Sequence, residues 1–151
     1  MSNLRSASRT IALLATACLG LATLGACSPS DAPSKSQATV EVDVYSGQEN
    51  PVATLGTEAL EQLDAFIVEH QDGAPEVEAL DDPLGFRGLV VTPDGPGMQW
   101  TGARVLKDAV RVTTDDSTVQ IEDDDSTAFD IVWNAIRGDL DETVVKAVDE
   151  S

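Results

Sequence analysis

The sequence has little cysteine, little histidine and few basic residues. Two Cys and one His among 151 residues are too few for a disulfide framework or a Cys/His zinc module. Nine Lys and Arg stand against 27 Asp and Glu, which gives a formal net charge of −18. A nucleic-acid binder concentrates Lys and Arg on one face, so this composition argues against that class. Aromatic residues make up only 4% of the chain, which leaves few for the platforms that glycosidases use to hold sugars.

Charge is also distributed unevenly along the chain. The first 26 residues contain Arg5 and Arg9 but no acid, and residues 11–26 are an uncharged run of apolar and small residues. A basic start followed by a short apolar run is typical of a secretory signal. A membrane-spanning helix needs about 20 predominantly apolar residues, so this run is short for one. Residues 28–37 are polar and rich in Ser and Pro, which is typical of a flexible tether.

The apolar run ends with Leu-Gly-Ala-Cys at residues 24–27, a quartet that resembles a bacterial lipobox. The resemblance implies a signal peptide over residues 1–26 and a lipid, such as palmitate, on the sulfur of Cys27. Cys18 lacks the Leu three residues before it that this motif requires. The alternative is an ordinary signal peptide cut after Ala26, which would leave Cys27 as an unpaired thiol in an oxidising compartment. Lipidation accounts for that cysteine, and it implies attachment to the extracytoplasmic face of the cell membrane.

The remaining chain is predicted to be a lipidated tether over residues 27–37 and a single domain over residues 38–151. Loss of the leader with its two arginines would change the net charge from −18 to −20. An anionic membrane surface repels so acidic a body, and the tether is expected to hold it away from the bilayer.

Apolar alternation predicts the strands of this domain. Alternating Val residues predict a strand over 38–45, and the continuous Leu-Val-Val run at 89–91 predicts a central strand that is covered on both faces. A meander over 98–122, broken at Lys107-Asp108 and Asp115-Asp116, predicts three further strands.

Helical spacing predicts the remaining elements. A helix capped by Thr57 and ending near Gln71 follows the first strand, and the region from Ser126 to Val148 contains a strongly amphipathic helix and a second, weaker one. The expected order is β-α-β-β-β-β-α. The fold class is therefore α+β, with a mostly antiparallel sheet of about five strands and helices covering one face.

Two short motifs lie on either side of the first helix. Residues 46–51 read S-G-x-x-N-P, in which Gly47 permits positive φ and Pro51 fixes the exit of a turn. Residues 85–88 read Gly-Phe-Arg-Gly. Together these segments resemble a family of uncharacterised bacterial secreted proteins and lipoproteins, over about residues 38 to 92. The matching positions are Ser46, Gly47, Asn50, Pro51, Gly85, Phe86, Arg87 and Gly88.

This resemblance implies no activity. The family often has Trp two residues after the Pro, and Ala53 occupies that position here. Turn chemistry explains each motif residue between Ser46 and Pro51, so a structural turn is favoured over a ligand loop.

Other candidate residues have simpler explanations. The acids at 122–125 lack the D-x-D-x-D-G spacing of a calcium loop and favour the start of the following helix instead, so no metal or cofactor is predicted. His70 is at a helix end, which favours a charged imidazole, and no G-x-S-x-G elbow accompanies it. Trp100 is a candidate interface anchor if it is exposed, or a core residue beneath a helix if it is buried.

The first hypothesis is a non-catalytic binding module, anchored to the membrane through Cys27, whose partner is another envelope protein or an extracellular ligand. The alternative is an envelope enzyme or enzyme inhibitor that presents the loop 46–51 to its target. A third reading is an acidic spacer that holds cations near the cell wall. No catalytic set is evident in the sequence, which favours the binding module.

Overall fold

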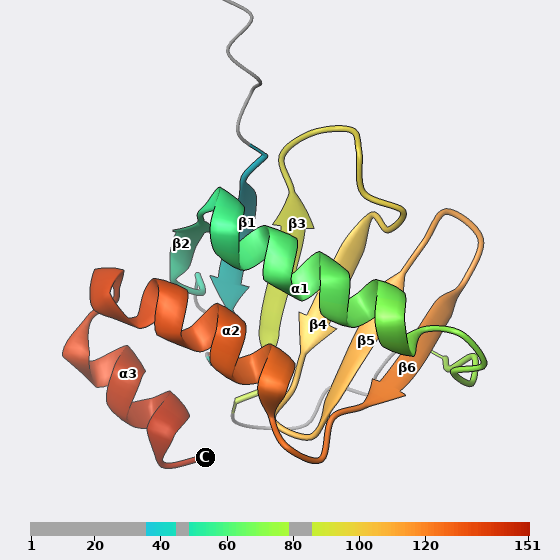
Figure 1. Cartoon of the computed structure of the whole chain (residues 1–151). Helices are drawn as coiled ribbons and strands as arrows, with labels where there is room; N and C mark the ends of the chain where they lie inside the picture. Colours follow the sequence, from blue (N-terminus) through green and yellow to red (C-terminus); the bar gives the residue numbers. More distant parts are fainter. Residues whose placement is uncertain (1–35, 45–48, 79–85) are drawn as a thin grey trace, which may run out of the picture. The chain divides into compact units, whose positions relative to one another are not determined.

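The computed structural model describes residues 36–44, 49–78 and 86–151. Within these residues, six antiparallel strands form one sheet in the order β2-β1-β3-β4-β5-β6 (Figure 1). The same residues also form three α-helices and one short 3-10 helix. The elements are β1 (Ala38–Val42), β2 (Val52–Leu55), α1 (Thr57–His70), β3 (Leu89–Pro93), β4 (Gly102–Val105), β5 (Ala109–Thr113), β6 (Thr118–Glu122), α2 (Thr127–Ile136), η1 (Arg137–Asp139) and α3 (Glu142–Asp149).

The predicted α+β class and antiparallel sheet are confirmed, but the predicted element order is wrong by one strand. β2 follows Pro51 directly and pairs with β1, with Glu41 opposite Val52. This strand has only four residues, and of these only Ala53 and Leu55 are buried. So short an alternation, directly after a proline, is indistinguishable in the sequence from the connection to the following helix.

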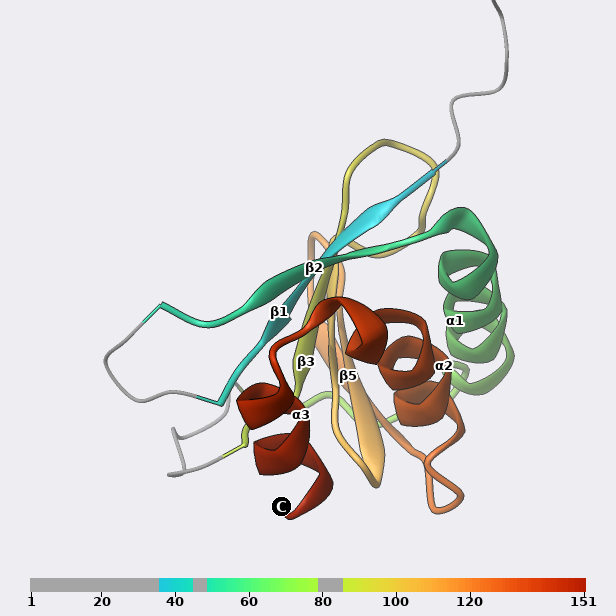
Figure 2. The ribbon, with the colours of Figure 1, turned by 90° about the vertical axis from the view of Figure 1, so that its left-hand side faces the viewer.

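The described helices all lie on one face of the sheet, and the core lies beneath them (Figure 2). Alternate strand residues such as Val40, Val91 and Val112 point into this core and are fully buried. Val90, between two buried neighbours, is half-buried. The expected coverage of this strand on both faces is therefore wrong, because no described helix lies on the other side.

The amphipathic faces of the helices meet this core as their spacing predicts. Leu60, Leu63 and Ile67 form the buried stripe of α1. The inward face of α2 is fully packed, and α3 lies beside α2 on the side away from α1 (Figure 1). The residues of α2 predicted to face the core are all buried: Phe129, Val132, Trp133 and Ile136.

The helix ends differ from the prediction at one position. Thr57 does not cap α1: Gly56 is the N-cap residue, and Thr57 is the first helical residue. At α2, the carboxylate of Asp123 accepts hydrogen bonds from the amides of Thr127 (2.9 Å) and Ala128 (2.8 Å), as expected for an acid at a helix start. No helix in the described residues has both the length and the apolar character needed to span a membrane.

The strand register fixes which loops share an end of the sheet. Ala38 pairs with Pro93 at the end where the chain arrives from the predicted tether. Val42 pairs with Leu89 at the opposite end. Because every neighbouring pair of strands is antiparallel, the last residue of β6, Glu122, also lies at the Val42 end.

Candidate functional site

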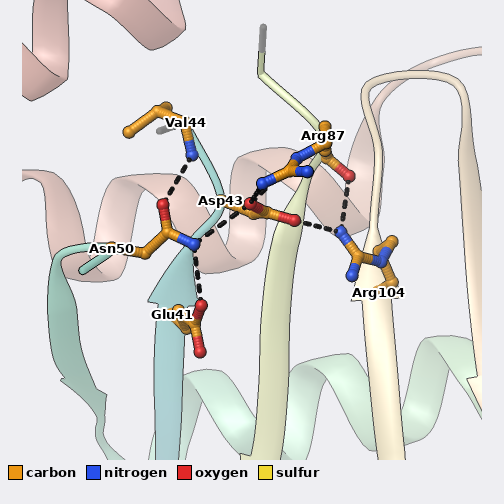
Figure 3. A network of polar contacts seen from close by, with 6 residues as sticks. All are labelled: Glu41, Asp43, Val44, Asn50, Arg87 and Arg104. Atoms are coloured by element: carbon orange, nitrogen blue, oxygen red, sulfur yellow. Dashed lines mark hydrogen bonds and ion pairs between the residues drawn. The ribbon is translucent and has the colours of Figure 1, made fainter. Parts of the chain in front are cut away.

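A buried carboxylate at the end of β1 joins the two sequence motifs. The Asp43 side chain is only 8% exposed and lies between two guanidinium groups (Figure 3). Its Oδ1 is 2.6 Å from Nη2 of Arg87, and its Oδ2 is 2.7 Å from Nη1 of Arg104. Nε of Arg87 also donates to Oδ1, at 3.0 Å, so Arg87 binds this oxygen with two donors. Such charge-assisted bonds are the strong ones in proteins.

Asn50 connects the S-G-x-x-N-P segment to the same carboxylate. Its Nδ2 donates to Oδ1 of Asp43 at 3.1 Å and to Oε1 of Glu41 at 2.8 Å. Its Oδ1 accepts from the amide of Val44 at 3.3 Å. The next residue, Pro51, accepts a hydrogen bond from the amide of Val42 (2.8 Å). The Asn-Pro pair thus fixes the return of the chain alongside β1.

Backbone contacts bring the Gly-Phe-Arg-Gly segment against β1. The Asp43 amide donates to the carbonyl of Gly88 (3.0 Å), and the Arg87 amide donates to the carbonyl of Asp43 (2.8 Å). Arg104 donates to the carbonyl of Arg87 (3.0 Å). Gly88 has a φ of +116°, and a Cβ at this position would lie 2.9 Å from the carbonyl oxygen of Val105. Only glycine fits this approach without strain.

Two opposing effects act on the pKa of Asp43. Burial raises the pKa of this carboxyl, because it disfavours the charged form. The hydrogen bonds and positive charges of Arg104 and Arg87 together outweigh burial, so the pKa lies below the ordinary aspartate value. The carboxylate is therefore ionised at neutral pH, and the network of Glu41, Asp43, Asn50, Arg87 and Arg104 is hereafter called the Asp43 network.

Several predicted site residues meet in the Asp43 network. Asn50, Pro51, Arg87 and Gly88 converge on the end of β1. The ring of Phe86 packs edge-on against Phe129, with centroids 6.0 Å apart. The remaining motif positions lie outside the described residues: Ser46, Gly47 and Gly85. Cys27 also lies outside them.

Sequence reasoning missed Asp43 and left Trp100 open. It placed Asp43 among the polar residues of an alternating strand that runs to position 45, which lies outside the described residues. β1 ends at Val42, and Asp43 is buried although it lies on the face of the sheet that carries Arg104. The signal that could have found it is an acid next to two motifs that supply an Arg and an Asn.

Trp100 is 3% exposed, and its Nε1 donates to Asp64 of α1 at 2.8 Å. Trp100 is therefore a core residue and not an exposed anchor.

A second feature is a groove of about 600 Å³ between the C-terminal half of α1 and the N-terminal half of α2, hereafter called the α1–α2 groove. Its apolar lining includes Phe66 and Ile131. His70 stacks on Phe66 with ring centroids 4.4 Å apart, and its Nδ1 lies 2.8 Å from the carbonyl oxygen of Phe66. The acids that follow β6 form another side of the groove. In the part of the chain that the structure describes, no group of three or more His, Cys, Asp and Glu is arranged to hold a metal ion.

Comparison with known proteins gives no further guide, because no protein-family model, curated protein or solved structure matches the chain.

The first prediction concerns the charge of Asp43. Asp43→Asn removes the negative charge that two partly buried guanidinium groups contact. Loss of one partner of a buried ion pair costs about 3–5 kcal/mol, and the 31% exposure of Arg104 reduces this cost. We expect the free energy of unfolding to fall by about 2–3 kcal/mol in chemical denaturation at pH 7. The control is Glu41→Gln, which removes an exposed charge from the same network and should cost less than about 0.5 kcal/mol.

The difference in unfolding free energy between wild type and Asp43→Asn should also depend on pH, in a direction that the pKa of Asp43 determines. The folded pKa of Asp43 is lowered, so its contribution is complete above the unfolded aspartate pKa of about 3.9. The contribution is lost as the pH falls from there through the folded pKa. The stability difference between wild type and Asp43→Asn should therefore be constant near neutrality and shrink below about pH 4. A difference that stays constant down to the acid-unfolding range would show that the charge of Asp43 is not what stabilises the network.

The second prediction concerns Gly88. Gly88→Ala forces a side chain into a positive-φ conformation and against the carbonyl of Val105, so we expect a loss of about 2–4 kcal/mol in thermal or chemical unfolding. Gly95→Ala is the matched control, because a Cβ there meets no atom within 4 Å. Equal effects of the two substitutions would rule out the close approach at Gly88 as the cause.

Proposed function

We propose that this chain is a lipid-anchored protein of the extracytoplasmic face of a bacterial cell membrane, and that its α+β domain is a non-catalytic binding module. The Leu-Gly-Ala-Cys quartet at 24–27 carries this proposal. It ends an uncharged run and precedes a polar segment, and the first strand of the domain begins soon afterwards, at Ala38. This order of leader, cysteine, polar segment and folded domain is the order that an anchored protein requires.

The polar segment has a length that suits a tether. Residues 28–37 span at most about 35 Å when fully extended. The domain with its lipidated cysteine would carry a net charge of −20, because both leader arginines would be lost with the signal peptide. An anionic bilayer surface repels such a body within about a Debye length, so the tether holds it in the space beyond the headgroups.

The use of the motif residues supports binding rather than catalysis. Asn50, Arg87 and Gly88 hold β1, β2 and β3 together at one end of the sheet, so these residues of the resembled motifs serve the scaffold. His70 is held by its own helix, through the stacked ring and the carbonyl of Phe66. A scaffold braced in this way presents the surface of its helices in one fixed arrangement, which is what a binding module needs.

The third prediction tests the anchor. In cells grown with an alkyne fatty acid, the wild-type protein should become labelled and sediment with membranes, because Cys27 carries the acyl chains. Cys27→Ser should lose the label and leave the membrane fraction, whereas Cys18→Ser should retain both. Labelling that survives Cys27→Ser, or that Cys18→Ser abolishes, would overturn the assignment of the lipidated residue.

The fourth prediction tests the binding role. Crosslinking of the tagged protein in its own cell envelope, followed by mass spectrometry, should recover one dominant partner that is lost from the Cys27→Ser control. The reason is that the anchor confines the domain to the compartment of that partner. Substrate turnover by the purified protein that His70→Ala abolishes would contradict a non-catalytic role.

A further inference from the structure

We propose that the α1–α2 groove binds a basic amphipathic segment of a partner protein, in which Lys or Arg residues flank an apolar side chain. This inference rests on the binding role proposed above and adds the surface and the chemistry of the partner. It does not depend on the lipid, because every residue that carries it lies in the folded domain.

The apolar part of the groove calls for an apolar side chain. Ala65 and Phe66 of α1 and Ile131 of α2 line it. Phe66 and Ile131 are only partly buried, so the core beneath them does not use all of their surface. The stacked ring of His70 extends the aromatic surface of Phe66. Burial of an apolar side chain here would remove both surfaces from water, which is favourable.

The acidic part of the groove calls for positive charge. Its acidic lining consists of Glu69 at the end of α1, Glu122 at the end of β6, and Asp124 and Asp125 in the turn that follows. In the described residues, the ion pairs of the domain lie elsewhere: at Asp43, at Asp149 and at Glu150. The groove acids therefore have no ion-pair partner among the described residues, and a basic partner would supply the opposite charge.

One member of the acidic run is already used and is not part of the binding set. Asp123 is buried and accepts hydrogen bonds from the first two amides of α2. Asp124 and Asp125 are exposed next to it, so the turn that starts the helix also places two exposed carboxylates at the groove.

The volume and position of the groove favour a protein segment. A space of about 600 Å³ accommodates several side chains, and a hydrated ion or a polyamine would leave the apolar lining exposed to water. The acids after β6 lie at the Val42 end of the sheet, whereas the chain arrives from the predicted tether at the Ala38 end. A partner can therefore approach the groove from the end of the sheet opposite Ala38.

The experiment uses the full chain in nanodiscs of neutral lipid and a fluorescent probe peptide in which Lys alternates with Leu and Phe. Anisotropy measures its dissociation constant, with empty nanodiscs as the blank. We expect saturable binding that weakens as ionic strength rises. A peptide with Ser in place of Leu and Phe should bind about tenfold more weakly, and one with Glu in place of Lys should not bind. If the Ser peptide bound as tightly as the peptide with Leu and Phe, the groove would attract any cationic peptide without using its apolar surface, and the proposal would be overturned.

Two pairs of variants locate the binding. Ala65 is exposed in the groove, so Ala65→Lys should reduce affinity at least about tenfold by filling it and neutralising its acids. Val68→Lys adds the same charge at an exposed position of α1 that does not line the groove, and should change affinity less than about twofold. Asp124→Asn with Asp125→Asn should weaken binding about three- to tenfold. The matched control is Asp115→Asn with Asp116→Asn, in the turn at the other end of β6, and it should have little effect.

These variants distinguish a failure of the groove proposal from a failure of the broader binding role. Equal losses in Val68→Lys and Ala65→Lys would mean that net charge, and not the groove, controls affinity, which overturns this inference. A partner crosslinked in the cell envelope whose capture is unchanged by Ala65→Lys would also overturn it, and would leave the binding role standing. Loss of both capture and peptide binding in Ala65→Lys, with Val68→Lys unchanged, is the result that we expect.

Discussion

The fold depends on one buried carboxylate. Asp43 lies where β1 ends, and its two oxygens hold Asn50, Arg87 and Arg104, which are far apart in the sequence. β1 separates β2 from the rest of the sheet, so the contacts at its end determine how the hairpin and β3 meet. A charge buried to this degree is tolerated only when paired and hydrogen-bonded. Asn50, Arg87 and Arg104 must therefore all contact the carboxylate in the folded state, and this requirement fixes the chain around each of them.

Much of the fold follows from periodicity in the sequence. The alternation in β1, β5 and β6 and the stripes of α1 and α2 predict which residues face the core, because side-chain direction repeats with the period of each element. The predictions that fail are those that depend on neighbours. β2 is too short for a period to be recognised, and the single covered face of β3 depends on where the helices lie. Gly56 takes the capping position that Thr57 was expected to hold.

The candidate sites were less accessible to sequence reasoning, for a physical reason. The two motifs could be recognised, but the Asp43 that joins them looks like any polar residue on the wet face of a strand. It is buried where two side chains from elsewhere in the chain meet it: Arg87, just before β3, and Arg104, on β4. The α1–α2 groove is also a product of tertiary structure, since Phe66 and Asp124 come together only when α2 packs beside α1. No local period can predict a surface that two distant segments share.

The net negative charge of the chain would have two separate effects in the anchored protein proposed here. Repulsion from an anionic bilayer acts on the whole domain and keeps it at the limit that the tether allows. Attraction of a basic partner acts locally, where Glu69, Asp124 and Asp125 gather beside apolar surface. The two effects do not compete, because Ala38, where the sheet begins, and the acids that follow Glu122 lie at opposite ends of the sheet. A long-range field of one sign would bring many cationic molecules near the domain, but only one that also fills the apolar part of the groove would remain bound. Specificity would thus come from the Phe66 and Ile131 surface, and the excess of acids would serve the rate of encounter.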